Sequence, residues 1–173
     1  EDWIVLVVRQ EEPTDIAAVR DVNERAFGQT DEADLVDKLR DRRKVTLSLV
    51  AVKDDWVVGH ILFSSATIES DAESLPSVGL GPMAVLPEYQ GQGIGSALVR
   101  HGLAACRRAG HEVVVVLGHA DYYPRFGFVR ASTFGIRCEY DVPDDVFMLN
   151  EVREGALPGH GGTARYQPEF GEV

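Results

Sequence analysis

Three glycines at alternate positions, within Gln90-Gly91-Gln92-Gly93-Ile94-Gly95, form the segment of this chain best suited to chemistry. Glycine has no side chain, so a ligand can approach its backbone closely, and it tolerates positive φ angles. A loop of this kind before a helix directs unpaired N–H groups and the positive end of the helix dipole at one point. The segment therefore predicts a phosphate-binding loop.

The residues that follow the loop argue against two common nucleotide sites. A P-loop requires Lys and then Ser or Thr after its last glycine, whereas Gly95 is followed by Ser96 and Ala97. A dinucleotide fingerprint has glycines at its first, third and sixth positions and an acid at the end of the next strand. Counted from Gly91, the sixth position is Ser96, and the next apolar run ends with Leu117 and a glycine. We therefore expect a different phosphate-bearing ligand.

A second motif with chemical potential is Tyr123-Pro124-Arg125-Phe126-Gly127-Phe128, which follows the next apolar run after the loop. A phenol has a pKa of about 10, so it stays protonated at neutral pH and can donate to an anion. The alternative interpretation is that Tyr122 and Tyr123 are packed aromatic residues whose hydroxyls are hydrogen-bonded.

Taken together, Met83-Ala84-Val85, the Gln90–Gly95 loop and the Tyr123–Phe128 motif resemble the GNAT superfamily of acyl-CoA-dependent N-acetyltransferases, and within it the YhbS-like subgroup. The resemblance follows the element order over about residues 1–150. It implies acetyl-CoA (coenzyme A) as the acyl donor, no metal, and transfer of the acetyl group to a primary amine of a small molecule or a protein. It is also compatible with a homodimer, because late strands in this family often pair between subunits.

The resemblance implies cofactor contacts in two segments. Backbone groups of the strand that contains Met83, Ala84 and Val85 would pair with the pantetheine arm, in the gap where this strand splays from residues 113–117. The loop amides would hold the CoA pyrophosphate. The loop residues are Gln90, Gly91, Gln92, Gly93, Ile94, Gly95 and Ser96. Relatives often carry Arg or Lys within the loop, so the neutral Gln92 would leave phosphate affinity to the amides and the helix dipole, with help from distant arginines.

Acetyl transfer requires a neutral amine, a stabilised oxyanion and a proton for the departing thiolate. The resemblance assigns the last task to Tyr123 as general acid. The general base stays open: a chain of water, or one of Glu69, Asp71, Glu73, His60 and His119. The alternative function is an acyl-CoA-binding sensor or regulatory module without transfer activity. A longer acyl donor or a hydroxyl acceptor would keep the same chemistry.

Composition and charge limit the function classes. The 173 residues are 45% hydrophobic and 26% charged, which suits a single globular domain over residues 1–173, with an irregular tail from about residue 154. A net charge of −11 argues against binding to nucleic acid or to an anionic membrane. Two cysteines without the spacing of a metal site, Cys106 and Cys138, are interpreted as structural and predict a cytoplasmic protein.

Charge is distributed unevenly along the chain. Residues 1–75 contain 17 acids and 9 bases, whereas residues 89–130 contain five arginines and two acids. The basic stretch fits an anionic cofactor near the loop, and scattered solvated charges explain it equally well. Acids of the first two helices would favour a cationic amine or would simply be solvated. They are Glu24, Asp31, Glu32 and Asp34.

The remaining pattern places these motifs on alternating elements. Strands are expected over residues 3–8, 45–52, 56–68, 77–85, 111–117, 128–140 and 145–150, and residues 69–77 form a polar loop. Helices are expected over residues 14–27, 30–40, 93–109 and, briefly, 119–126. In the third helix Ile94, Ala97, Leu98 and Ala105 share one face, and His101 is interpreted as packed. The fold class is α/β (α+β mixed). With the resemblance it becomes one domain with a mixed, mostly antiparallel sheet of splayed strands and about four helices.

Overall fold

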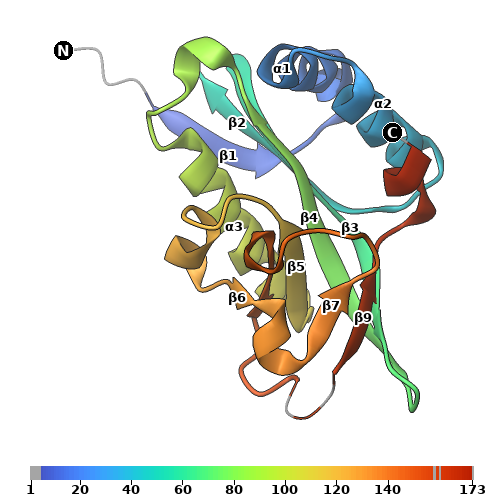
Figure 1. Cartoon of the computed structure of the whole chain (residues 1–173). Helices are drawn as coiled ribbons and strands as arrows, with labels where there is room; N and C mark the ends of the chain where they lie inside the picture. The colour runs from blue at the N-terminus through green and yellow to red at the C-terminus, as the bar shows by residue number, and fades with distance from the viewer. Residues whose placement is uncertain (1–4, 158, 160, 173) are drawn as a thin grey trace. The chain divides into compact units, whose positions relative to one another are not determined.

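A computed structural model describes residues 5–157, 159 and 161–172, and it has the mixed α/β fold class that the sequence predicts (Figure 1). The α-helices of these residues are α1 (Ile16–Phe27), α2 (Asp31–Asp41) and α3 (Ile94–Arg108). The strands are β1 (Leu6–Gln10), β2 (Val45–Lys53), β3 (Trp56–Glu69), β4 (Ser74–Val85), β5 (Val113–Leu117), β6 (Val129–Arg130), β7 (Ile136–Cys138), β8 (Phe147–Glu151) and β9 (Gly162–Arg165). Short 3-10 turns connect several of them.

The strands follow the order β1-β2-β3-β4-β5-β8-β6, and β9 pairs with both β3 and β7. Strand β1 runs antiparallel to β2, and β8 runs antiparallel to both β5 and β6. Pairing between β4 and β5 is parallel and covers Val78 to Leu80. Parallel neighbours require a crossover connection, and α3 provides it between these two strands. The mixed, mostly antiparallel character of the sheet is therefore confirmed.

The chain divides into two compact units. Unit 1 contains the described residues of 1–63, 82–102 and 169–173, and unit 2 contains those of 64–81 and 103–168. Strands β3 and β4 and helix α3 each continue from one unit into the other.

In unit 1, α1 and α2 lie side by side and pack on one face of β2 and β3 (Figure 1). Their apolar residues recur every three or four positions, so each helix presents one stripe to the sheet. The resulting core contains Val19 of α1, Leu35, Val36 and Leu39 of α2, Val50 of β2 and Leu62 of β3. The helices predicted over residues 14–27 and 30–40 are confirmed as α1 and α2.

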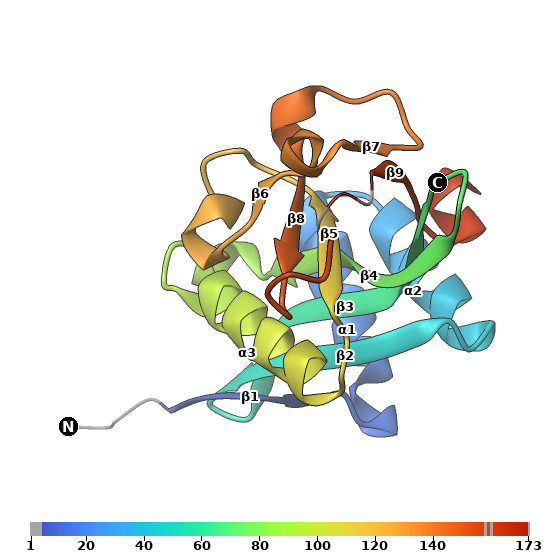
Figure 2. The ribbon, with the colours of Figure 1, turned by 90° about the horizontal axis from the view of Figure 1, so that it is seen from below.

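The first turns of α3 pack on the other face of the same strands (Figure 2). Side chains alternate between the faces of a strand, so Gly59 and Phe63 lie opposite to Leu62. Leu98 and Ile94 close over Gly59, and the Phe63 ring lies where a side chain at position 102 would be. Only glycine fits there.

The buried face of α3 differs from the expected one. Ile94, Leu98 and Cys106 are at most 3% exposed, whereas Ala97 and Ala105 are half-buried. His101 is exposed, so the interpretation that it packs in the core is wrong. Residues four apart on a helix share a stripe, and here the stripe runs through Gly102 because the Phe63 ring occupies that place.

Two predicted boundaries near the start of the chain need correction. The first strand is β1 from Leu6, and the earlier part of the predicted range falls on residues 1–4, outside the described residues. The polar loop predicted over residues 69–77 is shorter, because β3 extends to Glu69 and β4 begins at Ser74. The extension of β3 follows from β9, which pairs with residues 67–69 and supplies backbone partners from the distant tail.

The second half of the chain is more broken than the sequence predicts. The strand expected over residues 128–140 is two short strands, β6 and β7, separated by a 3-10 turn that ends at Gly135 with φ 70°. The helix expected over residues 119–126 is one 3-10 turn, Tyr123–Phe126, which Gly127 ends with φ 91°. The tail expected to be irregular contains β9 and a further 3-10 turn, Pro168–Glu172. The described residues therefore contain three α-helices rather than about four.

None of the helices in the described ranges has both the length and the apolar character needed to cross a membrane.

Candidate functional site

The predicted site residues fall in both units. Unit 1 contains the end of β4 with Met83, Ala84 and Val85, and the loop from Gln90 into the start of α3. Unit 2 contains Tyr123.

The glycine loop has the backbone that a phosphate cradle requires. Gly91 and Gly93 adopt positive φ angles of 75° and 82°, which glycine tolerates far better than any other residue. A side-chain carbon built at either position would meet no atom within 4 Å, so the space beside both residues is open. The α-helix begins directly afterwards at Ile94, which leaves the first N–H groups of α3 at the loop. Gly95 and Ser96 lie in this first turn.

Gln90 fixes the loop to the strand that precedes it. Its side-chain Nε2 donates to the backbone oxygen of Val85 at 3.0 Å. Ala84 and Val85 are buried, and Met83 is half-buried. The Val85 carbonyl keeps a second lone pair, so it can still accept a hydrogen bond from a ligand.

A cation that sequence reasoning missed lies beside the loop. Lys53, the last residue of β2, donates from Nζ to the Oε1 atom of Gln92 at 3.0 Å. Its ammonium is also 5.5 Å from the centre of the Tyr89 ring. The two residues that form the hydrogen bond are 39 positions apart in sequence, so no local pattern indicates the contact.

In unit 2, Tyr123 is enclosed by aromatic rings. Its side chain is 6% exposed and makes edge contacts with Tyr122, Phe126 and Phe128, at centroid distances of 5.2, 6.5 and 5.5 Å. A side-chain carbon at Gly118 would overlap the Tyr123 ring, so the chain after β5 passes directly against it. The packed-aromatic interpretation describes the ring correctly and leaves the role of the hydroxyl open.

Burial raises the pKa of Tyr123 to about 12. Desolvation is the main cause, because it disfavours the charged phenolate, and the neighbouring Tyr122 adds to the effect. The phenol is therefore protonated throughout the neutral range and is available as a donor.

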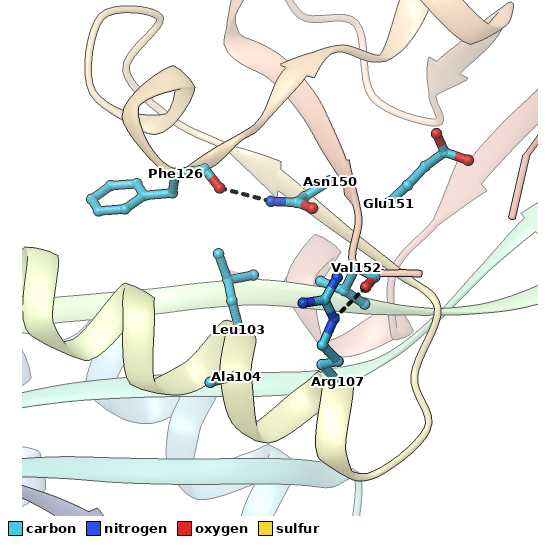
Figure 3. A pocket seen from close by; sticks show the side chains of 7 residues that line it. All are labelled: Leu103, Ala104, Arg107, Phe126, Asn150, Glu151 and Val152. Carbon is cyan, nitrogen blue, oxygen red and sulfur yellow. Dashed lines mark hydrogen bonds between the residues drawn. The ribbon is translucent and has the colours of Figure 1, made fainter. Parts of the chain in front are cut away.

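Asn150 of β8 positions the turn that carries Tyr123. Its Nδ2 donates to the backbone oxygen of Phe126 at 2.9 Å, as Figure 3 shows beside a hollow of about 300 Å³. In the same view Arg107 of α3 donates from Nε to the backbone oxygen of Val152 at 2.9 Å. The hydrogen bond from Asn150 satisfies the end of the 3-10 turn where Gly127 changes the chain direction. The sequence carries no local signal for this contact.

His60, one of the candidate bases, is fully buried inside unit 1. Asn23 Nδ2 is bonded to the Val19 carbonyl at 2.9 Å, so the same amide nitrogen faces His60 Nδ1 at 3.1 Å as a donor. Nδ1 must then accept, and Nε2 carries the proton toward Ser48 Oγ at 2.9 Å. Desolvation, with the nearby Arg40, lowers the His60 pKa to about 3. The ring is a neutral structural hydrogen-bonding group with no free lone pair, which argues against His60 as the base.

The other candidate bases lie at the surface of unit 2. Glu69 Oε2 accepts from Arg165 Nε at 2.5 Å, so its carboxylate is already paired. Asp71, Glu73 and His119 are exposed. The structure leaves these residues, or a water chain, as alternatives.

Ion pairs engage several of the charges that the sequence singled out. In unit 1, Arg20 pairs with Glu24 at 2.8 Å and with Asp34 at 2.9 Å, so these two acids are not free to attract a cationic amine. In unit 2, Arg125 lies 5.3 Å from the centre of the Tyr122 ring, and Arg130 pairs with Asp144 at 3.5 Å. These pairs account for part of the basic stretch without a ligand.

The two cysteines are free thiols. Cys106 is 1% exposed, and burial raises its pKa to about 12, which makes it unreactive. Burial also raises the pKa of Cys138. Across the described part of the chain, no group of three or more His, Cys, Asp or Glu side chains could hold a metal ion.

Comparison with known proteins gives consistent matches. Residues 7–131 match the family model of the acetyltransferase (GNAT) domain. YhbS of Escherichia coli (strain K12), described as an uncharacterized N-acetyltransferase, is 34% identical over 166 residues, which are 95% of this chain and 98% of the relative. YjhQ of the same organism, with the same description, is 43% identical over 135 residues, 76% of this chain and 75% of the relative.

Solved structures match along nearly the whole chain. The crystal structure of E. coli YhbS in complex with CoA gives a TM-score of 0.93 at 33% identity and covers 99% of this chain and 94% of its own. A GNAT family acetyltransferase from Brucella melitensis, in complex with acetyl-CoA, gives a TM-score of 0.78 at 37% identity, with 96% and 98% covered.

Proposed function

The chain belongs to the GNAT acetyltransferase family, and from that premise we propose that it transfers an acetyl group from acetyl-CoA to a primary amine of a small molecule or a protein. The observation that carries the proposal is the open glycine loop, with Gly91 and Gly93 at positive φ immediately before α3. Solved relatives that hold CoA and acetyl-CoA support this choice of ligand. When bound, acetyl-CoA supplies the acetyl group and leaves as its thiol.

The loop is proposed to hold the cofactor pyrophosphate. The amides of residues 91–96 and the dipole of α3 attract the phosphates, and the missing side chains of Gly91 and Gly93 allow close approach. The fit is supported by the empty space around both glycines. At the end of β4, backbone groups of Met83 to Val85 are proposed to pair with the pantetheine amides.

Tyr123 is proposed as the donor to the departing sulfur. With its pKa near 12 and a thiol pKa of about 8.5, complete proton transfer to a free thiolate costs about 5 kcal/mol. We therefore propose that Tyr123 acts as general acid only while the C–S bond breaks, when its hydrogen bond to the sulfur strengthens into proton transfer. Tyr123 gives its phenolic proton to the sulfur, and solvent at once reprotonates the tyrosinate, which offsets this cost. The proton that the amine loses goes to water or to one of the surface acids.

The test is incubation of the protein with acetyl-CoA and a broad amine panel, with thiol release followed in time. Turnover above hydrolysis with at least one amine supports the proposal. Binding of CoA without any turnover would overturn transfer to an amine and favour an acyl-CoA sensor. A single acetyltransferase domain over residues 1–173, a homodimer and a cytoplasmic location stay predictions.

A further inference from the structure

Lys53 approaches the glycine loop from a different part of the chain. It is the last residue of β2, just before the turn to β3, and its Nζ donates to Gln92 Oε1 at 3.0 Å. The same ammonium lies over the Tyr89 ring, 5.5 Å from its centre. Both contacts come from the segment that leads into α3, so they hold a cation at the loop.

Neither contact neutralises the charge of Lys53, because an amide oxygen and an aromatic ring carry no net charge. The acid of the same segment, Glu88, already accepts two hydrogen bonds from Arg25 Nη2, each of 2.8 Å. Asp54 and Asp55 form the turn that follows Lys53, with φ angles of 51° and 64°. No carboxylate of a described residue lies within the 4.0 Å of Lys53 Nζ that defines an ion pair.

The geometry points to Lys53 as the cation that binds the pyrophosphate of acetyl-CoA at the Gln90–Gly95 loop, supplying from β2 the charge that Gln92 lacks. This inference rests on the proposed function. An ammonium group has three donors on a flexible stem, so it can keep the bond to Gln92 while another N–H turns to a phosphate oxygen. The open space beside Gly91 and Gly93 lets a diphosphate lie on the same loop.

The experiment measures the Kd of CoA and of dephospho-CoA by titration calorimetry at several salt concentrations. Lys53→Met should raise both values by about three- to fivefold, which is the most that a solvent-exposed charge pair usually contributes, and should weaken the salt dependence. Lys38→Met is the matched control. It removes the same charge from a half-buried position on α2, where Lys38 pairs with Glu172, and should stay within about twofold of wild type. Adding Gln92→Lys to Lys53→Met should restore affinity.

Equal effects of Lys53→Met and Lys38→Met would overturn the inference, since only general charge would then matter. A loss for CoA but not for dephospho-CoA would also overturn it, because Lys53 would then contact the 3′-phosphate. Thermal melting of both variants checks that they fold. If the folded wild-type protein binds neither CoA nor dephospho-CoA, the proposed function itself is refuted. If wild type binds both and Lys53→Met binds them equally well, only the inference about Lys53 is refuted.

Discussion

The glycine loop of unit 1 and the tyrosine turn of unit 2 offer chemistry in opposite ways. The loop offers backbone: Gly91 and Gly93 are exposed, and nothing surrounds the places where their side chains would be. The turn offers one side chain, Tyr123, enclosed by three rings and by the chain at Gly118. A ligand can approach the loop because its glycines have no side chains. The Tyr123 ring is held in place because other side chains fill the space around it.

The difference predicts how each region fails. Changes in the loop should alter phosphate binding through backbone strain. Changes around the turn should alter catalysis and stability through packing. Four variants test these two regions and the buried His60, and the largest expected effect comes first.

Removing the phenolic hydroxyl should separate chemistry from binding. Tyr123→Phe keeps the ring and its aromatic contacts, so the fold and the Kd of CoA should change little. The rate of thiol release should fall by about 100-fold or more, which is the usual contribution of a general acid. Tyr122→Phe, which changes the adjacent hydroxyl, should retain most of the activity. Equal rates for wild type and Tyr123→Phe would remove the catalytic role from the turn.

Filling the space at Gly118 should damage unit 2 through overlap. Gly118→Ala places a methyl group on the Tyr123 ring, so the free energy of unfolding, measured in urea, should fall by about 2–3 kcal/mol. Combination with Tyr123→Ala provides the control, because the two changes share one contact. The added cost of Gly118→Ala should disappear in the double-mutant cycle. Independent, additive costs would show that the ring does not fill this space.

The His60→Gln variant tests the interpretation that the buried His60 is a neutral structural residue and not the general base. Its pKa is about 3 in the folded chain and about 6.5 when unfolded, so the unfolded state binds more protons below pH 6.5. The stability that the neutral, buried His60 allows is present in full above pH 6.5. It decreases as the pH falls below 6.5 and is fully lost by about pH 3. The free energy of unfolding, measured in urea, should fall between pH 7 and pH 5 by about 2 kcal/mol more for wild type than for His60→Gln.

His60→Gln should still release thiol, since the geometry gives His60 a structural role. Loss of turnover in a folded His60→Gln protein would contradict that assignment.

The smallest effect is expected for the loop glycines. Gly91→Ala forces an L-residue into a positive φ angle, which should cost about 1 kcal/mol of stability and should raise the Kd of CoA. Gly28→Ala is the control, because Gly28 has a φ angle of 69° with open space around it, after α1. It should lose similar stability and keep the same Kd, as titration calorimetry can measure.

Local patterns predicted the elements of unit 1 well. The turn at Asp54 and Asp55, the end of α1 at Gly28 and the start of α3 after the loop depend on residues adjacent in sequence. Unit 2 was predicted less well, because β9 and the short β7 exist only through pairing with each other and, for β9, with β3. Strands of three or four residues have no period of their own long enough to recognise.

The sequence by itself determined the glycine loop, because the spacing of the glycines alone indicates a site that is formed by backbone groups. It also indicated the tyrosine motif and, through both, the family. Only the tertiary structure decided which other side chains contact these motifs: Lys53 contacts the loop, and Asn150 contacts the tyrosine turn. It also decided that His60 is a neutral, buried structural group. The contacts that fix these three side chains join residues 12 to 39 positions apart. Burial and hydrogen-bond geometry across such separations arise only when the chain has packed.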